Sequence, residues 1–272
     1  MTEWLDDPAT GRIPNVDRIT LRQLLNHTGG IYDYADEEDS PFWQVYLGDN
    51  PDWTRVWTIP ELLAYADGAS HAPYFAPGES WAYSNTGYVL LGLVVERVTG
   101  HRLADEVRDR VLVPLSLNET FLAEGAAIPA GTADCYHALA GELVNVTPIN
   151  LSWAWACGWT VSTMADFARF GRAMLDGALV SPASHREQFA FVPDPRFASV
   201  GWGMGVWSQP SAHGQVVGLG GDGPGFTANL ARLAKVDLTV AVLLNSAGGD
   251  AGTGDIRDEA FGALLGPVSF EA

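Results

Sequence analysis

The chain has 272 residues, of which 47% are hydrophobic and 18% are charged. A chain of this length buries roughly three quarters of the surface that it exposes when unfolded, so it needs no disulfide or metal to hold a core. Aromatic residues make up 11% of the chain, which excludes disorder as the dominant state. The net charge of −18 repels phosphate backbones and anionic lipids, so we expect no nucleic-acid partner and no attachment to a membrane surface.

The two cysteines, Cys135 and Cys157, are too few for a disulfide framework and lack the paired spacing of a zinc site. A single bridge between them and two separate buried thiols both stay open, and the usual burial of free cysteine favours the second. We expect no cofactor and no metal. The first eight residues lack the basic and apolar regions of a signal peptide, and the longest apolar run, residues 89–95, is too short to span a membrane.

The first two thirds of the chain predict helices joined by long loops. Capping boxes at Thr20–Gln23 and Thr58–Glu61 predict helices over residues 21–26 and 61–66. Helical spacing of apolar residues predicts a longer helix over 85–99, ended by Gly100, and another from 162 or 163 to just before Gly177.

The last third predicts short strands over residues 200–208, 215–219, 226–234 and 238–246. Turn-rich links at 210–214, 221–225 and 235–237 separate them, and links this short require antiparallel neighbours. The almost wholly apolar run 238–244 predicts a central strand covered on both faces, with a final helix over 253–265 as one cover. We therefore expect an α+β fold, with a mainly helical lobe over 1–190 and a sheet with a packed helix over 191–272, integrated into one domain.

Two patterns are weak indicators of function. Residues 218–223 match the G-x-G-x-x-G spacing of dinucleotide sites, but no strand–helix–strand unit surrounds them. The tryptophans at 153, 155 and 159 suggest either aromatic packing or a ligand platform, and packing is the more common role. No G-x-S-x-G elbow is present, so an α/β-hydrolase triad is excluded.

Four segments in order carry a resemblance to a known family. They are ITLRQLLNHTGG (19–30), FAPGESWAYSNTGY (75–88), CGWTVST (157–163) and GLGGDGPGF (218–226). Together they resemble the serine β-lactamase-like superfamily, which includes class C β-lactamases, DD-carboxypeptidases and family VIII-type esterases. The resemblance extends over about residues 5–265 and implies a β-lactamase/transpeptidase-like fold.

The resemblance implies a role for six residues. In this family a serine attacks an acyl carbon, and a lysine and a tyrosine handle its proton. Tyr83 corresponds to that tyrosine, and Asn85 to the amide that holds the substrate. Leu219, Gly220, Gly221 and Asp222 correspond to the strand beside the acyl group, where the backbone N–H of Asp222 would contribute to the oxyanion hole. The partner that we expect is a small-molecule acyl substrate or ligand.

Two departures from the family pattern change the expected activity. The only lysine is Lys235, and position 232 is an arginine, so the Ser-x-x-Lys motif is absent. Leu219 also replaces the cation of the third motif, which leaves Tyr83 without the positive charges that would make it a base. We therefore expect a chain that is inactive alone.

Three explanations of these departures stay open: an N-terminally incomplete enzyme that lacks the N-terminal strands of the sheet, a non-catalytic binding module, or one part of a split hydrolase. An exposed sheet edge would favour association with other chains. Relatives are often exported, but the chain contains no export signal, so its compartment stays open.

Overall fold

The computed structural model describes residues 4–5, 8–35, 40–123, 130–139, 141–158, 160–248 and 252–266. Contacts divide the chain into two compact units. The first contains Met1–Leu112, Phe121–Ala130 and Pro148–Val161; the second contains Val113–Thr120, Gly131–Thr147 and Ser162–Ala272. The helices and antiparallel strands within them confirm the α+β class.

The first unit is built from short helices and loops. Its elements are η1 (Thr10–Arg12), α1 (Leu21–Leu25), α2 (Pro41–Leu47), α3 (Ile59–Tyr65), α4 (Asn85–Thr99), α5 (Leu103–Val107), η2 (Arg108–Leu112), β1 (Phe121–Leu122), η3 (Leu151–Trp153), η4 (Trp155–Cys157) and β4 (Thr160–Val161). Both predicted capping boxes are present, at Thr20 and at Thr58. Helix α4 ends, as predicted, at Gly100, whose φ of 73° is the left-handed conformation that ends many helices.

Aromatic side chains fill the core of the first unit. The ring of Phe42 is completely buried and lies 5.3 Å from Tyr34, 5.2 Å from Trp57 and 5.5 Å from Trp153, centroid to centroid. Such rings bury large apolar areas and gain further from edge-to-face contact. Trp153 therefore packs in the core, as the packing interpretation predicted, whereas Trp159 lies outside the described residues.

Helix α4 packs closely on η4 because residue 92 is a glycine. A Cβ atom at Gly92 would lie 2.5 Å from the Cβ of Ala156 and 2.8 Å from the ring of Trp155. Trp155 therefore also packs within the first unit. This contact joins the segment after residue 150 to the helix that begins at Asn85.

The second unit contains a six-stranded antiparallel sheet in the order β10-β9-β8-β7-β6-β5. Its strands are β5 (Val192–Pro193), β6 (Gly201–Trp202), β7 (Trp207–Ser211), β8 (Gly214–Gly223), β9 (Phe226–Leu233) and β10 (Leu238–Leu244). The short links do join antiparallel neighbours, as predicted. Strand β8 is longer than the predicted 215–219, because only Pro224 and Gly225 form the turn that follows it.

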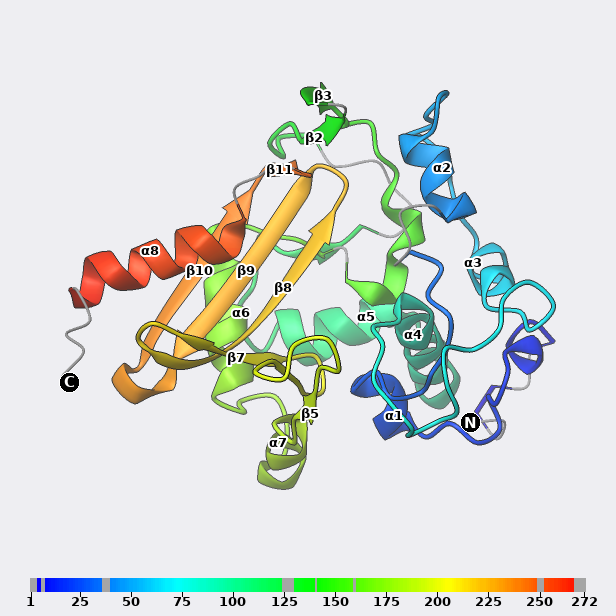
Figure 1. The fold of residues 1–272 in the computed structure, drawn as a ribbon, viewed down its shortest axis with the longest axis horizontal. Coiled ribbons are helices and arrows are strands. Elements are labelled where there is room, and N and C mark those ends of the chain that lie inside the picture. Colours follow the sequence, from blue (N-terminus) through cyan, green and yellow to red (C-terminus); the bar gives the residue numbers. More distant parts are fainter. Residues whose placement is uncertain are drawn as a thin grey trace. The chain divides into compact units, whose positions relative to one another are not determined.

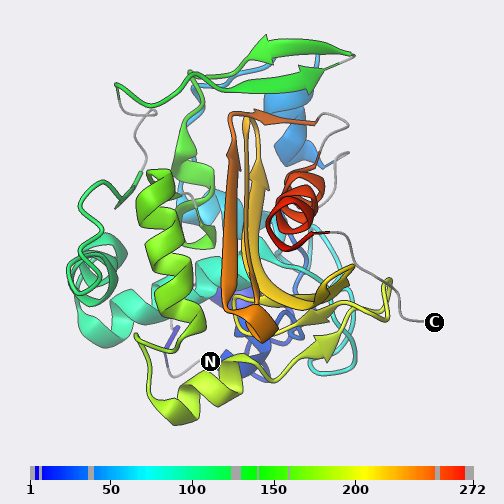
Figure 2. The same ribbon diagram turned by 90° about the vertical axis from the view of Figure 1, so that its left-hand side faces the viewer.

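Helices α6 (Met164–Leu175) and α8 (Thr253–Leu265) cover opposite faces of this sheet (Figures 1 and 2). Phe261 of α8 packs on Val216 and Leu233, while Leu175 of α6 packs on Leu230. Strand β10 is covered on both faces, as its apolar sequence predicted. Within the described residues, however, it pairs with β9 only and stands at the end of the strand order instead of its centre.

The contacts of α6 differ from the expected division of the chain at residue 190. A Cβ atom at Gly171 in α6 would lie 2.2 Å from the Leu230 side chain of β9. This close approach makes α6, together with α7 (Pro182–Gln188), part of the sheet-containing unit. Apolar spacing alone predicted the helix but not the surface on which it packs.

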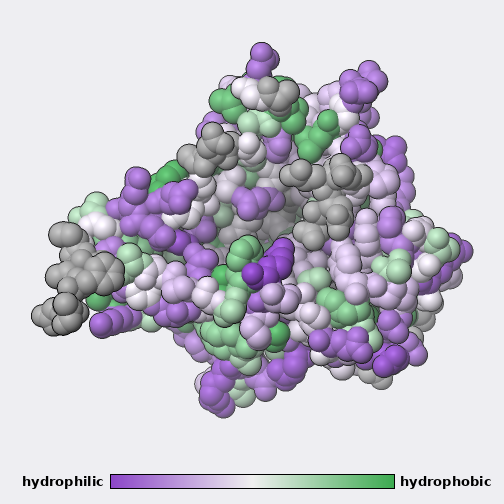
Figure 3. Space-filling view, viewed as in Figure 1, coloured by the Kyte–Doolittle hydropathy of each residue, from purple (hydrophilic) through white to green (hydrophobic). Residues whose placement is uncertain are grey.

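A small hairpin completes the second unit. Strands β2 (Tyr136–Leu139) and β3 (Glu142–Asn145) pair antiparallel, and β11 (Ser246–Ala247) pairs parallel with β2. Hydrophobic atoms are visible at this hairpin in Figure 3, where Leu143 and Val144 of β3 are exposed. Among the described helices of the whole chain, none is long and apolar enough to cross a membrane.

Candidate functional site

Residues 83–85, here called the tyrosine segment, lead into α4. Ser84 is the N-cap of this helix, and its hydroxyl accepts a hydrogen bond from the N–H of Gly87 at 3.1 Å. Asn85 is the first helical residue. A serine hydroxyl that caps a helix satisfies one of the free N–H groups of the first turn. The local sequence thus holds Tyr83 and Asn85 on either side of a structural serine.

His27 holds the backbone of the tyrosine segment. Its Nδ1 accepts a hydrogen bond from the N–H of Ser84 at 3.1 Å, and its ring lies 4.5 Å from the ring of Tyr83 and 5.1 Å from that of Tyr88, centroid to centroid. Burial lowers the pKa of His27 to about 4, so the imidazole is neutral at pH 7, as an Nδ1 acceptor must be. His27 also has a φ of 60°, a left-handed conformation that is uncommon for residues other than glycine.

Asp33 holds the side chain of Asn85. The carboxylate of Asp33 is completely buried, and its Oδ2 accepts a hydrogen bond from Nδ2 of Asn85 at 2.9 Å. Its Oδ1 accepts from the N–H of Ala35 at 3.1 Å, and its own N–H donates to the hydroxyl of Tyr74 at 3.1 Å. Buried carboxylates require such donors, because an unpaired charge is costly to remove from water.

A half-buried thiol lies against the backbone of the tyrosine segment. Cys157 donates from Sγ to the backbone oxygen of Asn85 at 3.1 Å, and the hydroxyl of Tyr34 lies 3.4 Å from the same sulfur. Burial raises the pKa of both groups, so at neutral pH the thiol is a hydrogen-bond donor and not a nucleophile. Cys135 and Cys157 are both free, which excludes the bridge between them.

The second candidate segment is the far half of β8. Strand β7 pairs with residues 214–218 of β8, whereas β9 pairs with residues 216–223. Among the strands that the structure describes, residues 219–223 therefore pair with β9 on one side and with no strand on the other. These residues are here called the open edge. An open edge of this kind offers backbone donors and acceptors to an extended ligand.

The two-residue turn after β8 fixes which groups point outward. With only Pro224 and Gly225 between them, Gly223 and Phe226 are a pair that exchanges both hydrogen bonds. Because opposed residues alternate between bonded and non-bonded pairs, the N–H groups of Gly220 and Asp222 point away from β9. The N–H that the resemblance assigns to the oxyanion hole is thus directed to the open edge.

The side chain of Leu219 points to the face covered by α6. It packs, half-buried, on the cluster of Leu175, Val206 and Leu230. Gly220, Gly221 and Asp222 are exposed. An aliphatic side chain at position 219 offers no charge to a carboxylate, in agreement with the departure that the sequence indicated.

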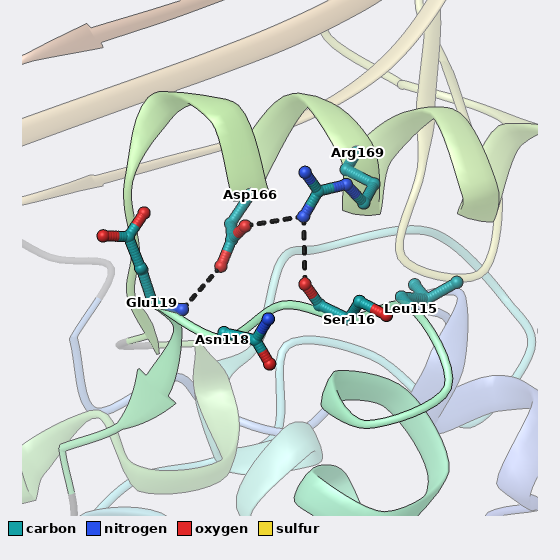
Figure 4. A pocket seen from close by; sticks show the side chains of 6 residues that line it. All are labelled: Leu115, Ser116, Asn118, Glu119, Asp166 and Arg169. Atoms are coloured by element: carbon teal, nitrogen blue, oxygen red, sulfur yellow. Dashed lines mark hydrogen bonds and ion pairs between the residues drawn. The ribbon is translucent and has the colours of Figure 1, made fainter.

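A further hollow lies in the second unit, between residues 115–119 and α6 (Figure 4). Asp166 accepts from the N–H of Glu119 at 2.9 Å and pairs with Arg169 at 2.8 Å, while Arg169 donates to the backbone oxygen of Ser116 at 3.0 Å. These side chains bind protein groups that would otherwise be unpaired. The hollow is a structural link between a loop and a helix.

In the ranges that the structure describes, no group of three or more His, Cys, Asp and Glu side chains is arranged to hold a metal ion. The single lysine, Lys235, is exposed in η5 (Ala234–Val236), the link between β9 and β10. The Ser-x-x-Lys pair therefore has no counterpart in this sequence.

Two residues of the tyrosine segment's support had no predicted role. His27 stands within the first motif, and Asp33 follows that motif by three residues. The signal that identifies Asp33 is its position between Ile31, Tyr32 and Tyr34, since a carboxylate inside an apolar run is often buried and paired. No feature of the sequence identifies His27; its hydrogen bond with Ser84 is seen only in the structure.

The helices and the helix-covered antiparallel sheet have the fold of β-lactamases and penicillin-binding proteins, which a penicillin-binding protein from Bacillus halodurans shares (26% identical, TM-score 0.75, covering 97% of this chain and 77% of its own). The Beta-lactamase family model matches residues 3–263, and the chain belongs to this family of serine hydrolases.

Individual relatives agree with this assignment. Penicillin-binding protein 4* of Bacillus subtilis is 27% identical over 241 residues, which cover 84% of this chain and 51% of that protein. The chain thus spans about half the length of this relative. Among solved structures, a D-stereospecific amidohydrolase from Streptomyces is 31% identical with a TM-score of 0.83, covering 97% of this chain and 80% of its own. The D-amino acid amidase from Ochrobactrum anthropi complexed with D-phenylalanine is 25% identical with a TM-score of 0.80, covering 97% and 76%.

Proposed function

We propose that this chain binds an acyl compound of the kind that its family processes: a β-lactam, a D-amino-acid peptide or amide, or an ester. The observation that carries the proposal is the open edge, where the N–H groups of Gly220 and Asp222 point away from the sheet. The names of its relatives, which include penicillin-binding proteins and D-amino acid amidases, support this range of ligands.

In the proposed binding mode, the acyl group lies along the open edge. An extended amide or ester donates and accepts hydrogen bonds there as an added strand would, and the N–H of Asp222 stabilises negative charge on the acyl oxygen. Within the first unit, Asn85 is proposed to bind a substrate amide, and the hydroxyl of Tyr83 to handle a proton. These roles follow from the family resemblance at each position.

We further propose that this chain alone forms no acyl-enzyme. A serine becomes nucleophilic when an adjacent base accepts its proton. Ser84 caps α4, and the hydroxyl of Ser162 lies 2.8 Å from that of Thr120 and donates to the backbone oxygen of Thr163. With Lys235 as the only lysine, neither serine has the partner that the family's mechanism requires.

A split hydrolase is the second candidate function, and the position of β10 favours it. This apolar strand is covered on both faces yet pairs only with β9 among the described strands. Its other side offers backbone groups to a strand from another chain. Such a chain would bring the Ser-x-x-Lys motif, and the two chains together would form the enzyme. A non-catalytic binding module would show the same ligand binding and no such complementation.

Mass spectrometry after incubation with a fluorescent penicillin and with a nitrophenyl ester tests catalysis. We expect no covalent adduct and no hydrolysis above that of buffer. A stoichiometric adduct on any serine would disprove the proposed lack of a nucleophile.

Titration with D-phenylalanine amide and with benzylpenicillin, followed by amide NMR, tests binding. We expect shifts at residues 83–85 and 219–223. The substitution Asp222→Pro removes an N–H that β9 does not use, so it should weaken binding about tenfold, the effect of one lost donor, while the sheet persists. Asp222→Ala keeps that N–H and is the matched control. If both ligands leave these residues unshifted, the proposed function is wrong.

A further inference from the structure

The contact between Asp33 and Asn85 determines how the amide of Asn85 is turned. A carboxylate only accepts hydrogen bonds, so the atom of Asn85 that lies 2.9 Å from Oδ2 of Asp33 must be the NH₂ group. The amide oxygen of Asn85 then points the other way. Cys157 donates to the backbone oxygen of Asn85, not to its side chain, and within the described residues Oδ1 of Asn85 accepts no hydrogen bond.

Asp33 is itself held in place, which makes it able to orient another group. Its Oδ1 is bound by the N–H of Ala35, its N–H is bound by Tyr74, and its carboxylate is completely buried. A residue with both oxygens and its backbone fixed has little freedom to follow a moving partner. The rotamer of Asn85 therefore adapts to Asp33, and not the reverse.

The backbone around Asn85 is held by residues other than Asp33. His27 binds the N–H of Ser84, and Cys157 binds the backbone oxygen of Asn85. With the main chain fixed at both sides, the remaining freedom of Asn85 is the rotation of its side chain, and Asp33 is the contact that removes it.

We infer that Asp33 is a positioning residue that presents Oδ1 of Asn85 as a hydrogen-bond acceptor to the ligand site. The inference rests on the proposed function, in which Asn85 contacts the bound acyl compound or its reaction partner. The ligand group that meets Oδ1 is then an N–H or ammonium donor, and the remaining N–H of Asn85 is available to an acceptor beside it. Asp33 does not touch the ligand and acts only through Asn85.

The substitution Asp33→Asn makes a specific and testable change. The N–H of Ala35 still requires an acceptor, so the oxygen of the new amide stays on that side and its NH₂ faces Asn85. Two NH₂ groups repel each other at hydrogen-bond distance, and the amide of Asn85 should therefore invert, with Oδ1 turned inward and NH₂ outward. A residue with a merely structural role would leave the Asn85 amide unchanged.

NMR of the whole chain, labelled with ¹⁵N and ¹³C, measures this orientation directly. In the wild type we expect a scalar coupling through the hydrogen bond from ¹⁵Nδ2 of Asn85 to ¹³Cγ of Asp33, and exchange of the bonded proton with water about tenfold slower than that of its twin. In Asp33→Asn the coupling should run in the opposite direction, from the side-chain nitrogen of position 33 to ¹³Cγ of Asn85. The matched control is Asp17→Asn, which changes an exposed carboxylate of the same unit and should leave the Asn85 signals in place.

Each outcome decides one question. Absence of the coupling in the wild type overturns the inference, whether or not the variant folds. Signals of Asn85 that are the same in Asp33→Asn and in the wild type overturn it as well. Because neither measurement involves a ligand, failure of D-phenylalanine amide and benzylpenicillin to bind would reject the proposed function, whereas the orientation of the Asn85 amide by Asp33 would still stand.

Discussion

Acidification from pH 7.0 to 4.5 should destabilise the folded chain through His27. In the folded state this imidazole is neutral, accepts a hydrogen bond from the N–H of Ser84 and lies against the rings of Tyr83 and Tyr88. Protonation would place a charge in a buried site and remove the acceptor on Nδ1. The folded protein therefore resists protonation of a group that the unfolded chain protonates readily.

The size of the effect follows from the two pKa values. Burial lowers the pKa of His27 from 6.5 to about 4. Above pH 6.5 the imidazole is neutral in both states, and its contribution to stability is fully present. Between pH 6.5 and 4 the unfolded chain binds one more proton, so the free energy of unfolding falls by up to about 1.4 kcal/mol per pH unit. The total loss is about 3 kcal/mol, of which about 2 kcal/mol occurs between pH 7.0 and 4.5.

Urea unfolding, followed by tryptophan fluorescence at several pH values, measures this loss. The His27→Gln variant retains an acceptor for the N–H of Ser84 but cannot titrate. Over the same interval, its free energy of unfolding should therefore fall by about 2 kcal/mol less than that of the wild type. His213→Gln, which changes a histidine in the turn between β7 and β8, is the control and should follow the wild type. Parallel curves for the wild type and His27→Gln would refute the assigned burial of a neutral imidazole.

Three further substitutions test other parts of the structure. Leu219→His should place an imidazole against the apolar cluster of Leu175, Val206 and Leu230 and lower the free energy of urea unfolding by about 1–3 kcal/mol, whereas Leu219→Met, which keeps an apolar side chain of similar size, should cost less than about 1.5 kcal/mol; equal costs would contradict the packing of Leu219. Gly225→Ala should lower the free energy of urea unfolding by about 1–3 kcal/mol, because φ is 83° and the new Cβ would lie 2.6 Å from Sγ of Cys135; unchanged stability would contradict this packing. Burial opposes ionisation of Asp194, but hydrogen bonds from Arg196 and Trp202 lower its pKa to about 2. Asp194→Asn should therefore cost about 2 kcal/mol at pH 7, and this cost should shrink as the pH falls from 3.8 towards 2; an equal cost at both ends of that range would exclude the role of the charge.

Local signals in the sequence predicted the elements whose ends are set by chemistry within a few residues. The two capping boxes and Gly100 fixed three helix ends, and the short links fixed the antiparallel pairing of the sheet. The division of the chain was less predictable. Helix α6 belongs with the sheet because Gly171 allows it to approach Leu230, a contact between residues that are far apart in sequence.

The motifs of the candidate site came from the sequence, and their roles stay predictions; the residues that support them were found only in the structure. The resemblance identified Tyr83 and Asn85 from residue types at a fixed spacing. Their anchors, His27 and Asp33, lie more than fifty residues earlier, and no spacing rule connects them to the tyrosine segment. The outward direction of the Asp222 N–H also required the register of β8 with β9, which depends on a turn of two residues where the sequence predicted a longer one.

The two cysteines lie in different compact units, Cys157 in the first and Cys135 in the second. Burial raises the pKa of Cys135 to about 11 and raises that of Cys157 as well, so each thiol reacts slowly with alkylating reagents while its unit stays closed. Each thiol thus reports on the opening of its own unit. Under native conditions, the relative rates at which a thiol reagent modifies the two cysteines would reveal whether the units open together or one before the other. The wild-type chain carries this pair of probes without any engineered label.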